Sequence, residues 1–200
     1  MIISLILLAV FGVVAVGLWR EGFWHAAVML LTVLLAATAA TAWYEWLAVL
    51  IDRQSPTYTY LVDFVMLWAL FCGITAVLRE VTERVWRYKV KLRRPIEMFG
   101  TPVVAAVAGW IVMAFTAATL HTAPLPRDTI QPTPEARLLF GLSPDRKWLA
   151  WVRGSTRVGP FANPQAPFDP QADFIIRYAD RRKKLEAEPE LRVAGPPGRL

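Results

Sequence analysis

Apolar residues in this sequence fall into long unbroken runs instead of recurring at the spacing of a soluble core. Four runs are long enough to cross a membrane, at about residues 1–19, 23–46, 60–79 and 101–120. A crossing needs roughly 20 mostly apolar residues, because the hydrocarbon core is about 30 Å thick and a helix rises about 1.5 Å per residue. The pattern predicts an all-α polytopic membrane domain of about four transmembrane helices over residues 1–120.

The second apolar run extends past a single span. It contains the cluster Trp43-Tyr44-Glu45-Trp46, which is typical of the aromatic belt at a membrane surface. We therefore expect residues 47–51 to lie along that surface.

The segment between the third and fourth apolar runs, residues 79–99, has a different pattern. Apolar residues recur there at spacings of three and four from Leu78 to Leu92, which predicts an amphipathic helix ending before Pro95. One alternative is a simple extension of the third span into water, and the other is an interfacial helix on anionic lipid. The residues proposed to hold lipid are Arg87, Lys89, Lys91, Arg93 and Arg94.

The same basic loop predicts the orientation of the chain. Seven Lys and Arg residues lie between spans three and four, against Arg53 alone between spans two and three. Cytoplasmic loops carry the excess of basic residues, so we expect both termini outside the cytoplasm.

The tail, residues 121–200, is proline-rich and has three helix-start signals. Thr133-Pro134-Glu135 opens a short turn ending near Gly141, Ser143-Pro144-Asp145 opens a helix closing at Gly154, and Asp169-Pro170 opens another with Phe174, Ile175, Tyr178 and Leu185 on one face. The tail has too few large apolar side chains to build a deep hydrophobic core of its own. We expect a small helical tail that leans on the outer loops of the bundle or on a partner.

The whole chain of 200 residues is 56% hydrophobic and 19% charged, which is the composition of a membrane protein. Its net charge of +6 is split between the loop and the tail and so does not indicate nucleic-acid binding. Cys72 is the only cysteine, and the chain lacks the spacings of the common catalytic, phosphate-binding and zinc motifs. We predict no enzyme activity, no cofactor and no metal site.

A few residues within the predicted spans are candidates for a polar site or for close helix packing. Glu45 and Asp63 could meet at one level of the bundle as an ion or proton site. Ala105 and Gly109 stand four apart in the fourth span and form a small face for close helix packing.

One turn and one helix resemble a known family. The turn reads Gly17-Leu-Trp-Arg-Glu-Gly22-Phe23, and the basic residues Arg93 and Arg94 precede a fourth helix rich in small residues that includes Gly100, Ala105, Ala106 and Gly109. Over residues 1–120 the layout resembles the bacterial colicin V production protein family, although Glu21 is inserted in its turn and the family's acidic residue at the start of the first helix is missing.

The resemblance implies a non-enzymatic inner-membrane protein with a role in toxin production, export or envelope maintenance, and it supplies no catalytic residues. Two other functions stay open at this point. One is an accessory or scaffold subunit of a larger membrane complex, and the other is a small oligomeric channel or transporter. Association with the bilayer and with another membrane protein or a second copy is expected in each case.

Overall fold

The computed structural model describes residues 2–52, 59–85, 94–125, 130, 133, 135–158, 162 and 167–187. The described chain is helical and contains no strand. Its elements are α1 (Ile2–Glu21), α2 (Phe23–Asp52), α3 (Thr59–Val85), the π-helical turn η2 (Ile96–Gly100), α4 (Thr101–Leu120), α6 (Pro144–Arg157) and α7 (Phe174–Ala187).

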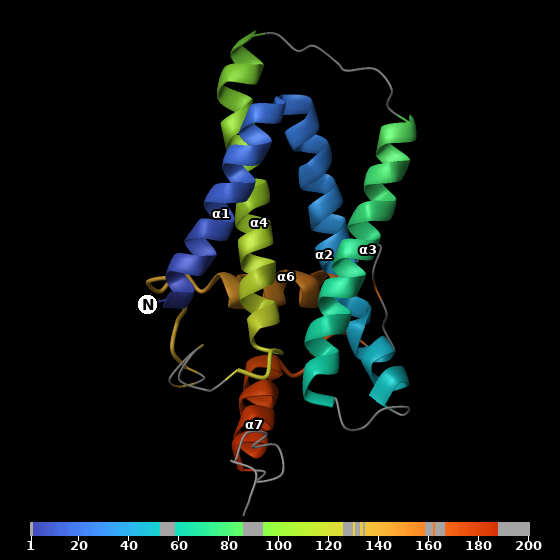
Figure 1. The fold of residues 1–200 in the computed structure, drawn as a ribbon, viewed down its shortest axis with the longest axis vertical. Coiled ribbons are helices and arrows are strands. Elements are labelled where there is room, and N and C mark those ends of the chain that lie inside the picture. The colour runs from blue at the N-terminus through green and yellow to red at the C-terminus, as the bar shows by residue number, and fades with distance from the viewer. Residues whose placement is uncertain are drawn as a thin grey trace, which may run out of the picture.

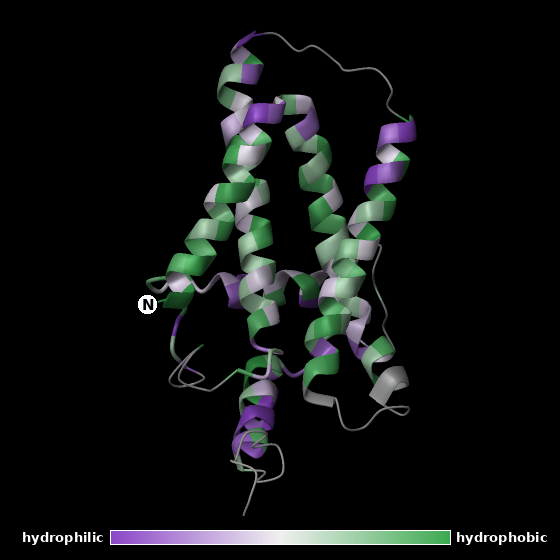
Figure 2. Ribbon diagram, in the orientation of Figure 1, coloured by the Kyte–Doolittle hydropathy of each residue, from purple (hydrophilic) through white to green (hydrophobic). Residues whose placement is uncertain are grey.

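Four of these helices are long and apolar enough to cross a membrane (Figures 1 and 2). The qualifying segments are Ile2–Glu21, Phe23–Val49, Leu61–Val85 and Ile96–Leu120. The predicted all-α polytopic membrane fold is therefore confirmed. Figure 2 places the hydrophilic residues mainly at the two ends of the bundle and in the tail.

Two spans are longer than the sequence predicts. Residues 47–51 do not form a separate interfacial segment, because α2 continues as one helix to Asp52. No proline or glycine interrupts it before that point. α3 continues past Leu78 to Val85 because Arg79 pairs with Glu83 and Glu80 with Arg84 at i,i+4 spacing. As far as Val85, the loop is thus an extension of the third span.

The fourth span begins earlier than the predicted residue 101. Helical residues start at Arg94, pass through η2 and run directly into α4. α3 ends at Val85, before Pro95 as predicted. Pro95 stands in the first turn of the next helical segment, where proline is tolerated because its missing N–H would have no helical acceptor. Of the proposed lipid-binding residues, Arg94 is exposed, while Arg87, Lys89, Lys91 and Arg93 fall outside the described residues.

The bundle packs through small residues. α1 lies along α4, and α2 lies between α3 and α4. A Cβ on Gly109 would stand 3.0 Å from the carbonyl oxygen of Phe11 and 3.2 Å from its ring, so glycine allows α4 to approach α1 closely. Ala105 is buried on the same helix. The turn between α1 and α2 is made at Gly22, whose φ of +91° favours glycine.

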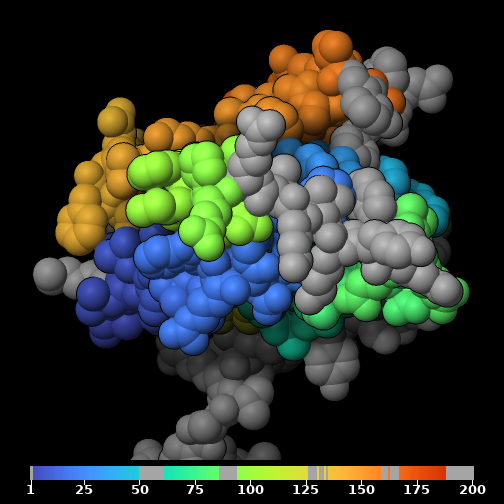
Figure 3. All heavy atoms as spheres, turned by 90° about the horizontal axis from the view of Figure 1, so that it is seen from above, coloured from blue at the N-terminus to red at the C-terminus, as the bar shows by residue number. Residues whose placement is uncertain are grey.

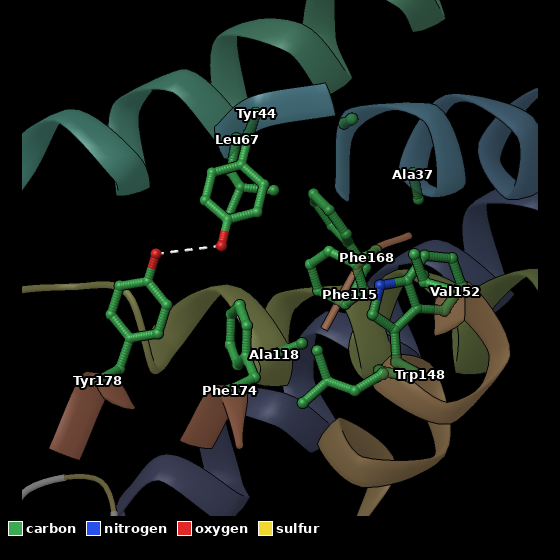
Figure 4. Packing of buried hydrophobic residues seen from close by; sticks show 13 residues of the cluster. Ala37, Tyr44, Leu67, Phe115, Ala118, Trp148, Val152, Phe168, Phe174 and Tyr178 are labelled. Carbon is green, nitrogen blue, oxygen red and sulfur yellow. Dashed lines mark hydrogen bonds between the residues drawn. The ribbon is translucent and has the colours of Figure 1, made fainter. Parts of the chain in front are cut away.

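The described part of the tail packs on the bundle, and its large buried apolar residues belong to clusters shared with the bundle. A cluster of buried residues joins bundle and tail (Figure 4), with Leu67, Phe115 and Ala118 from the bundle and Trp148, Val152, Phe168 and Phe174 from the tail. It packs on the sides of α2, α3 and α4, whereas we expected it to lean on the outer loops of the bundle or on a partner.

The two tail helices differ from their predicted bounds. α6 continues past Gly154 to Arg157. α7 begins at Phe174 rather than at Asp169-Pro170, because Asp169 acts from outside the helix: its Oδ1 accepts hydrogen bonds from the backbone N–H groups of Asp173 and Phe174.

Candidate functional site

The most concentrated group of polar side chains lies where α7 meets α2 and α3. We call it the tail polar cluster. Its members are Tyr44 and Glu45 from α2, Asp63 from α3, and Arg177, Tyr178 and Arg181 from α7. Phe174 and Tyr178 stand one helical turn apart on the buried face of α7, so the helix places Tyr178 and its arginines toward the bundle.

Asp63 is the centre of this cluster. It is buried near the start of α3, and its Oδ2 accepts a hydrogen bond of 2.7 Å from the Tyr178 hydroxyl. The same oxygen accepts a hydrogen bond from the Arg181 guanidinium, which neutralises the carboxylate. A buried carboxylate requires such partners, since an unpaired charge away from water is costly.

Glu45 forms the more exposed end of the cluster. Its Oε1 lies 3.1 Å from the Tyr44 hydroxyl and 3.4 Å from Nη2 of Arg177, and the side chains of Glu45 and Arg177 are about two-fifths exposed. This ion pair therefore contributes less than the pair at Asp63.

Two tyrosine hydroxyls connect the two carboxylates. The hydroxyl oxygens of Tyr44 and Tyr178 lie 3.0 Å apart (Figure 4). Each hydroxyl has one proton to donate. The Tyr178 proton serves Asp63, the shortest of these contacts, so the Tyr44 proton is left to be shared between Glu45 and Tyr178.

Tyr178 stays protonated in this setting. Burial raises the pKa of its phenol well above the ordinary value, and the nearby Asp63 carboxylate raises it further. The hydroxyl is thus a permanent donor, and the contact to Asp63 does not depend on a titration near neutral pH.

A second polar contact joins the end of α4 to the start of α6. Nε2 of His121 lies 3.0 Å from Oδ2 of Asp145, and both side chains are fully buried. Nη1 of Arg182 donates to the His121 carbonyl oxygen at 2.5 Å, so α7 joins the same point. Burial lowers the pKa of Arg182.

α6 is also tied to α2 and to the start of α7. The indole N–H groups of Trp148 and Trp151 donate to the hydroxyls of Thr41 and Thr38, each at 3.2 Å. Nη2 of Arg153 donates to Asp169 at 2.9 Å. α6 and α7 are therefore fixed to the bundle and to each other by directed polar contacts.

The structure brings together the two carboxylates that the sequence singles out, Glu45 and Asp63. It also adds partners that sequence reasoning missed, namely Tyr44, Arg177, Tyr178 and Arg181. The i,i+4 spacing of Arg177 and Arg181 beside the buried face of α7 was a signal for them, because it aligns two cations on one side of a helix.

Chemically, the cluster is a network of paired donors and acceptors that continues along α7, where Nε of Arg177 also lies 3.1 Å from Asp173. Two carboxylates face two guanidinium groups, and the hydroxyls occupy the space between them. Such an arrangement suits the holding of a helix in place. No group of three or more His, Cys, Asp or Glu side chains within the described part of the chain is arranged to hold a metal ion.

Comparison with known proteins gives one match. The family model described as colicin V production protein matches residues 3–164, which includes α6 and ends before α7. The match extends beyond the residues 1–120 over which the sequence resembles that family. No curated protein and no solved structure matches the chain.

Proposed function

Because the chain belongs to the colicin V production protein family, we propose that it is a non-enzymatic protein of the bacterial inner membrane that serves toxin production, toxin export or envelope maintenance. It acts through its surfaces, and the tail docked on the bundle forms one of them. The observation that carries this proposal is the commitment of Asp63 to Tyr178 and Arg181 of the tail.

That commitment separates the proposal from a transporter. A carboxylate that binds a coupling ion or proton has to be available to it, and intramembrane carboxylates are common sites of this kind. Asp63 is already neutralised by Arg181, and Glu45 is paired with Arg177 at a partly exposed position. The arrangement favours docking of the tail over ion coupling.

The proposal includes an orientation, with the tail outside the cytoplasm. It rests on the basic residues between α3 and α4. In a Cys72→Ser background, single cysteines at Arg94 and Asp180, both exposed, report on the two sides of the membrane. An impermeant reagent added to spheroplasts should label Asp180→Cys alone; labelling of Arg94→Cys instead would invert the orientation.

The functional test compares variants on the two sides of the docking contact. In a strain lacking the gene, we would measure complementation of toxin production and envelope integrity by Asp63→Asn, Arg181→Gln and the double variant. If docking is what matters, each single variant should impair function to a similar degree, and the double variant should be no worse than either, because all three break one contact.

The transporter alternative predicts a different pattern. Asp63→Asn would then abolish function while the tail stays docked, and Arg181→Gln would be mild because it leaves the carboxylate in place. Lys184→Gln, an exposed charge on the same helix, is the matched control for loss of a cation.

A scaffold role within a larger complex is a more specific form of the same proposal. Purification in mild detergent followed by identification of what accompanies the protein tests it. A stoichiometric foreign partner would support the scaffold role, whereas a ring of identical chains would favour the channel.

A further inference from the structure

A tight turn in the tail leaves an aromatic side chain outside the packed core. We call residues 138–143 the Phe140 turn. A backbone hydrogen bond of 3.1 Å from the Ser143 N–H to the Leu138 carbonyl oxygen closes it. Its backbone is left-handed at Leu139 and Phe140, with φ of +51° and +54°. Large side chains rarely adopt such angles, and a conformation of this cost persists only where its surroundings hold it in place.

The turn divides its apolar side chains into a buried set and an exposed set. Leu138 and Leu139 are buried in a cluster with residues from the N-terminal end of α1 and from α4. Phe140 is 81% exposed and Leu142 is 49% exposed. Packing on the bundle therefore accounts for the two buried leucines but leaves Phe140 uncovered.

The spans fix the level of the turn relative to the membrane. The 20 residues of α1 measure about 30 Å, the thickness of the hydrocarbon core, so the N-terminal end of α1 marks one membrane boundary. Ile3 at that end belongs to the same buried cluster as the two buried leucines of the turn. Trp43 of α2 stands about 30 Å along its helix from Phe23 and is exposed, as expected for the aromatic belt at the same boundary. The Phe140 turn therefore lies at the level of this boundary.

The turn lies on the side of the bundle. Figure 1 shows the gold segment before α6 at the height of the N-terminal end of α1, and Figure 3, viewed from above, shows gold residues at the outer edge of the molecule next to the dark blue start of α1. That start faces lipid, since Ile2, Leu5 and Ile6 are at least half exposed on a candidate membrane span. The Phe140 turn is thus continuous with a surface that faces acyl chains.

We propose that the Phe140 turn anchors the tail in the lipid surface next to the N-terminal end of α1. The side chains of Phe140 and Leu142 enter the boundary between headgroups and acyl chains, where their apolar surface is removed from water. The partner is the bilayer itself. This anchor holds the start of α6, while the tail polar cluster holds α7. It does not depend on which leaflet is the outer one.

The test measures how deep the turn lies, using the full chain in lipid nanodiscs. In a Cys72→Ser background, Leu142→Cys carries a nitroxide, and Asp180→Cys at an exposed position of α7 is the reference for water. Oxygen concentrates among acyl chains, whereas a nickel chelate stays in water. We expect oxygen to relax the nitroxide at position 142 more strongly than the chelate does, and the reverse order at position 180.

Substitutions at the tip of the turn then test the anchor itself. Phe140→Asp should raise the accessibility of position 142 to the chelate toward the value at position 180, because a carboxylate stays in water. Aspartate adopts left-handed angles more readily than phenylalanine, so the turn is retained. Phe140→Trp should keep the original values. Val158→Asp is the matched control, since Val158 is 80% exposed in the same tail, and it should leave position 142 unchanged.

Three results would overturn the proposal. The first is equal accessibility to the chelate at positions 142 and 180 with Phe140 intact. The second is protection of position 142 from both reagents, which would mean that protein covers the turn; spin–spin broadening would then identify a second copy of the chain. The third is an equal shift at position 142 in Phe140→Asp and Val158→Asp.

Discussion

The contact between α1 and α4 and the contact between α7 and the bundle are built by opposite means. Gly109 lets α4 approach the backbone of Phe11 without any side-chain polar group. α7 is held by hydroxyls and ion pairs centred on Asp63. Between helices in lipid, close approach of the backbones stabilises the contact through van der Waals packing. At the end of the bundle, a buried carboxylate instead requires hydrogen-bond donors and a cation to offset its loss of hydration.

The two contacts therefore fail in different ways. A close-packed contact is sensitive to added volume and indifferent to charge. A polar contact is sensitive to the loss of one partner, because the other partner stays buried and unpaired.

Removal of the Asp63 carboxylate should have the largest effect on the tail. Asp63→Ala removes the carboxylate that accepts from both Arg181 and Tyr178, and we expect a loss of about 3 kcal/mol in the docking of α7, at the lower end for buried pairs because Arg181 is 33% exposed. Limited trypsin digestion should then cleave within α7. Asp180→Ala, an exposed carboxylate, should digest like the wild type.

Added volume at Gly109 should affect the bundle. A leucine there meets the Phe11 carbonyl oxygen, so Gly109→Leu should destabilise the protein by about 2 kcal/mol. Thermal unfolding in detergent measures the change. Gly12→Leu on α1 is the matched control, since nothing lies within 4 Å of the site of its Cβ; an equal loss in both variants would remove the claim of close packing.

Loss of the central hydroxyl should be milder. Tyr44→Phe deletes one buried hydroxyl but leaves Asp63 with both of its donors, so we expect a loss of about 1 kcal/mol in α7 docking. Tyr178→Phe should cost more, because it also removes the donor to Asp63. The two variants can be ranked by the rate of trypsin cleavage, and the reverse ranking would contradict the assigned centre.

The smallest effect is expected at the exposed end of the cluster. Arg177→Gln breaks the pair with Glu45 and the i,i+4 pair with Asp173 within α7; these side chains are all more than a third exposed, so docking should weaken by about 0.5 kcal/mol. Repeating the digestion at high salt should shrink the difference from the wild type. A large effect that salt does not change would contradict the assignment of Arg177 to the weaker, exposed end of the cluster.

Sequence reasoning could predict the spans because their signal is local. A run of about 20 apolar residues indicates a crossing whatever the rest of the chain does. It also singled out Gly109, which the structure places against Phe11, and the two carboxylates, whose role as an ion or proton site stays a prediction. It placed the ends of α2, α3 and α4 too early or too late, since those ends depend on local pairs such as Arg79–Glu83 that favour continuation.

The partners of the carboxylates could not be predicted in the same way. Asp63 and Arg181 are separated by 118 positions, and no local pattern links them. The capping pattern placed the first helical residue at Pro170, directly after Asp169, whereas α7 begins at Phe174, five residues after Asp169. Long-range polar pairing is set by how the tail folds back on the bundle.

The central claim is that Asp63 docks α7, and adjacent positions on that helix test it most directly. In a Cys72→Ser background, Ala179→Cys is buried and Asp180→Cys is exposed. We predict that a maleimide labels position 179 much more slowly than position 180, and that adding Asp63→Asn raises the rate at 179 toward the rate at 180. Equal rates at the two positions with Asp63 intact, or slow labelling of position 179 that Asp63→Asn leaves unchanged, would contradict the account.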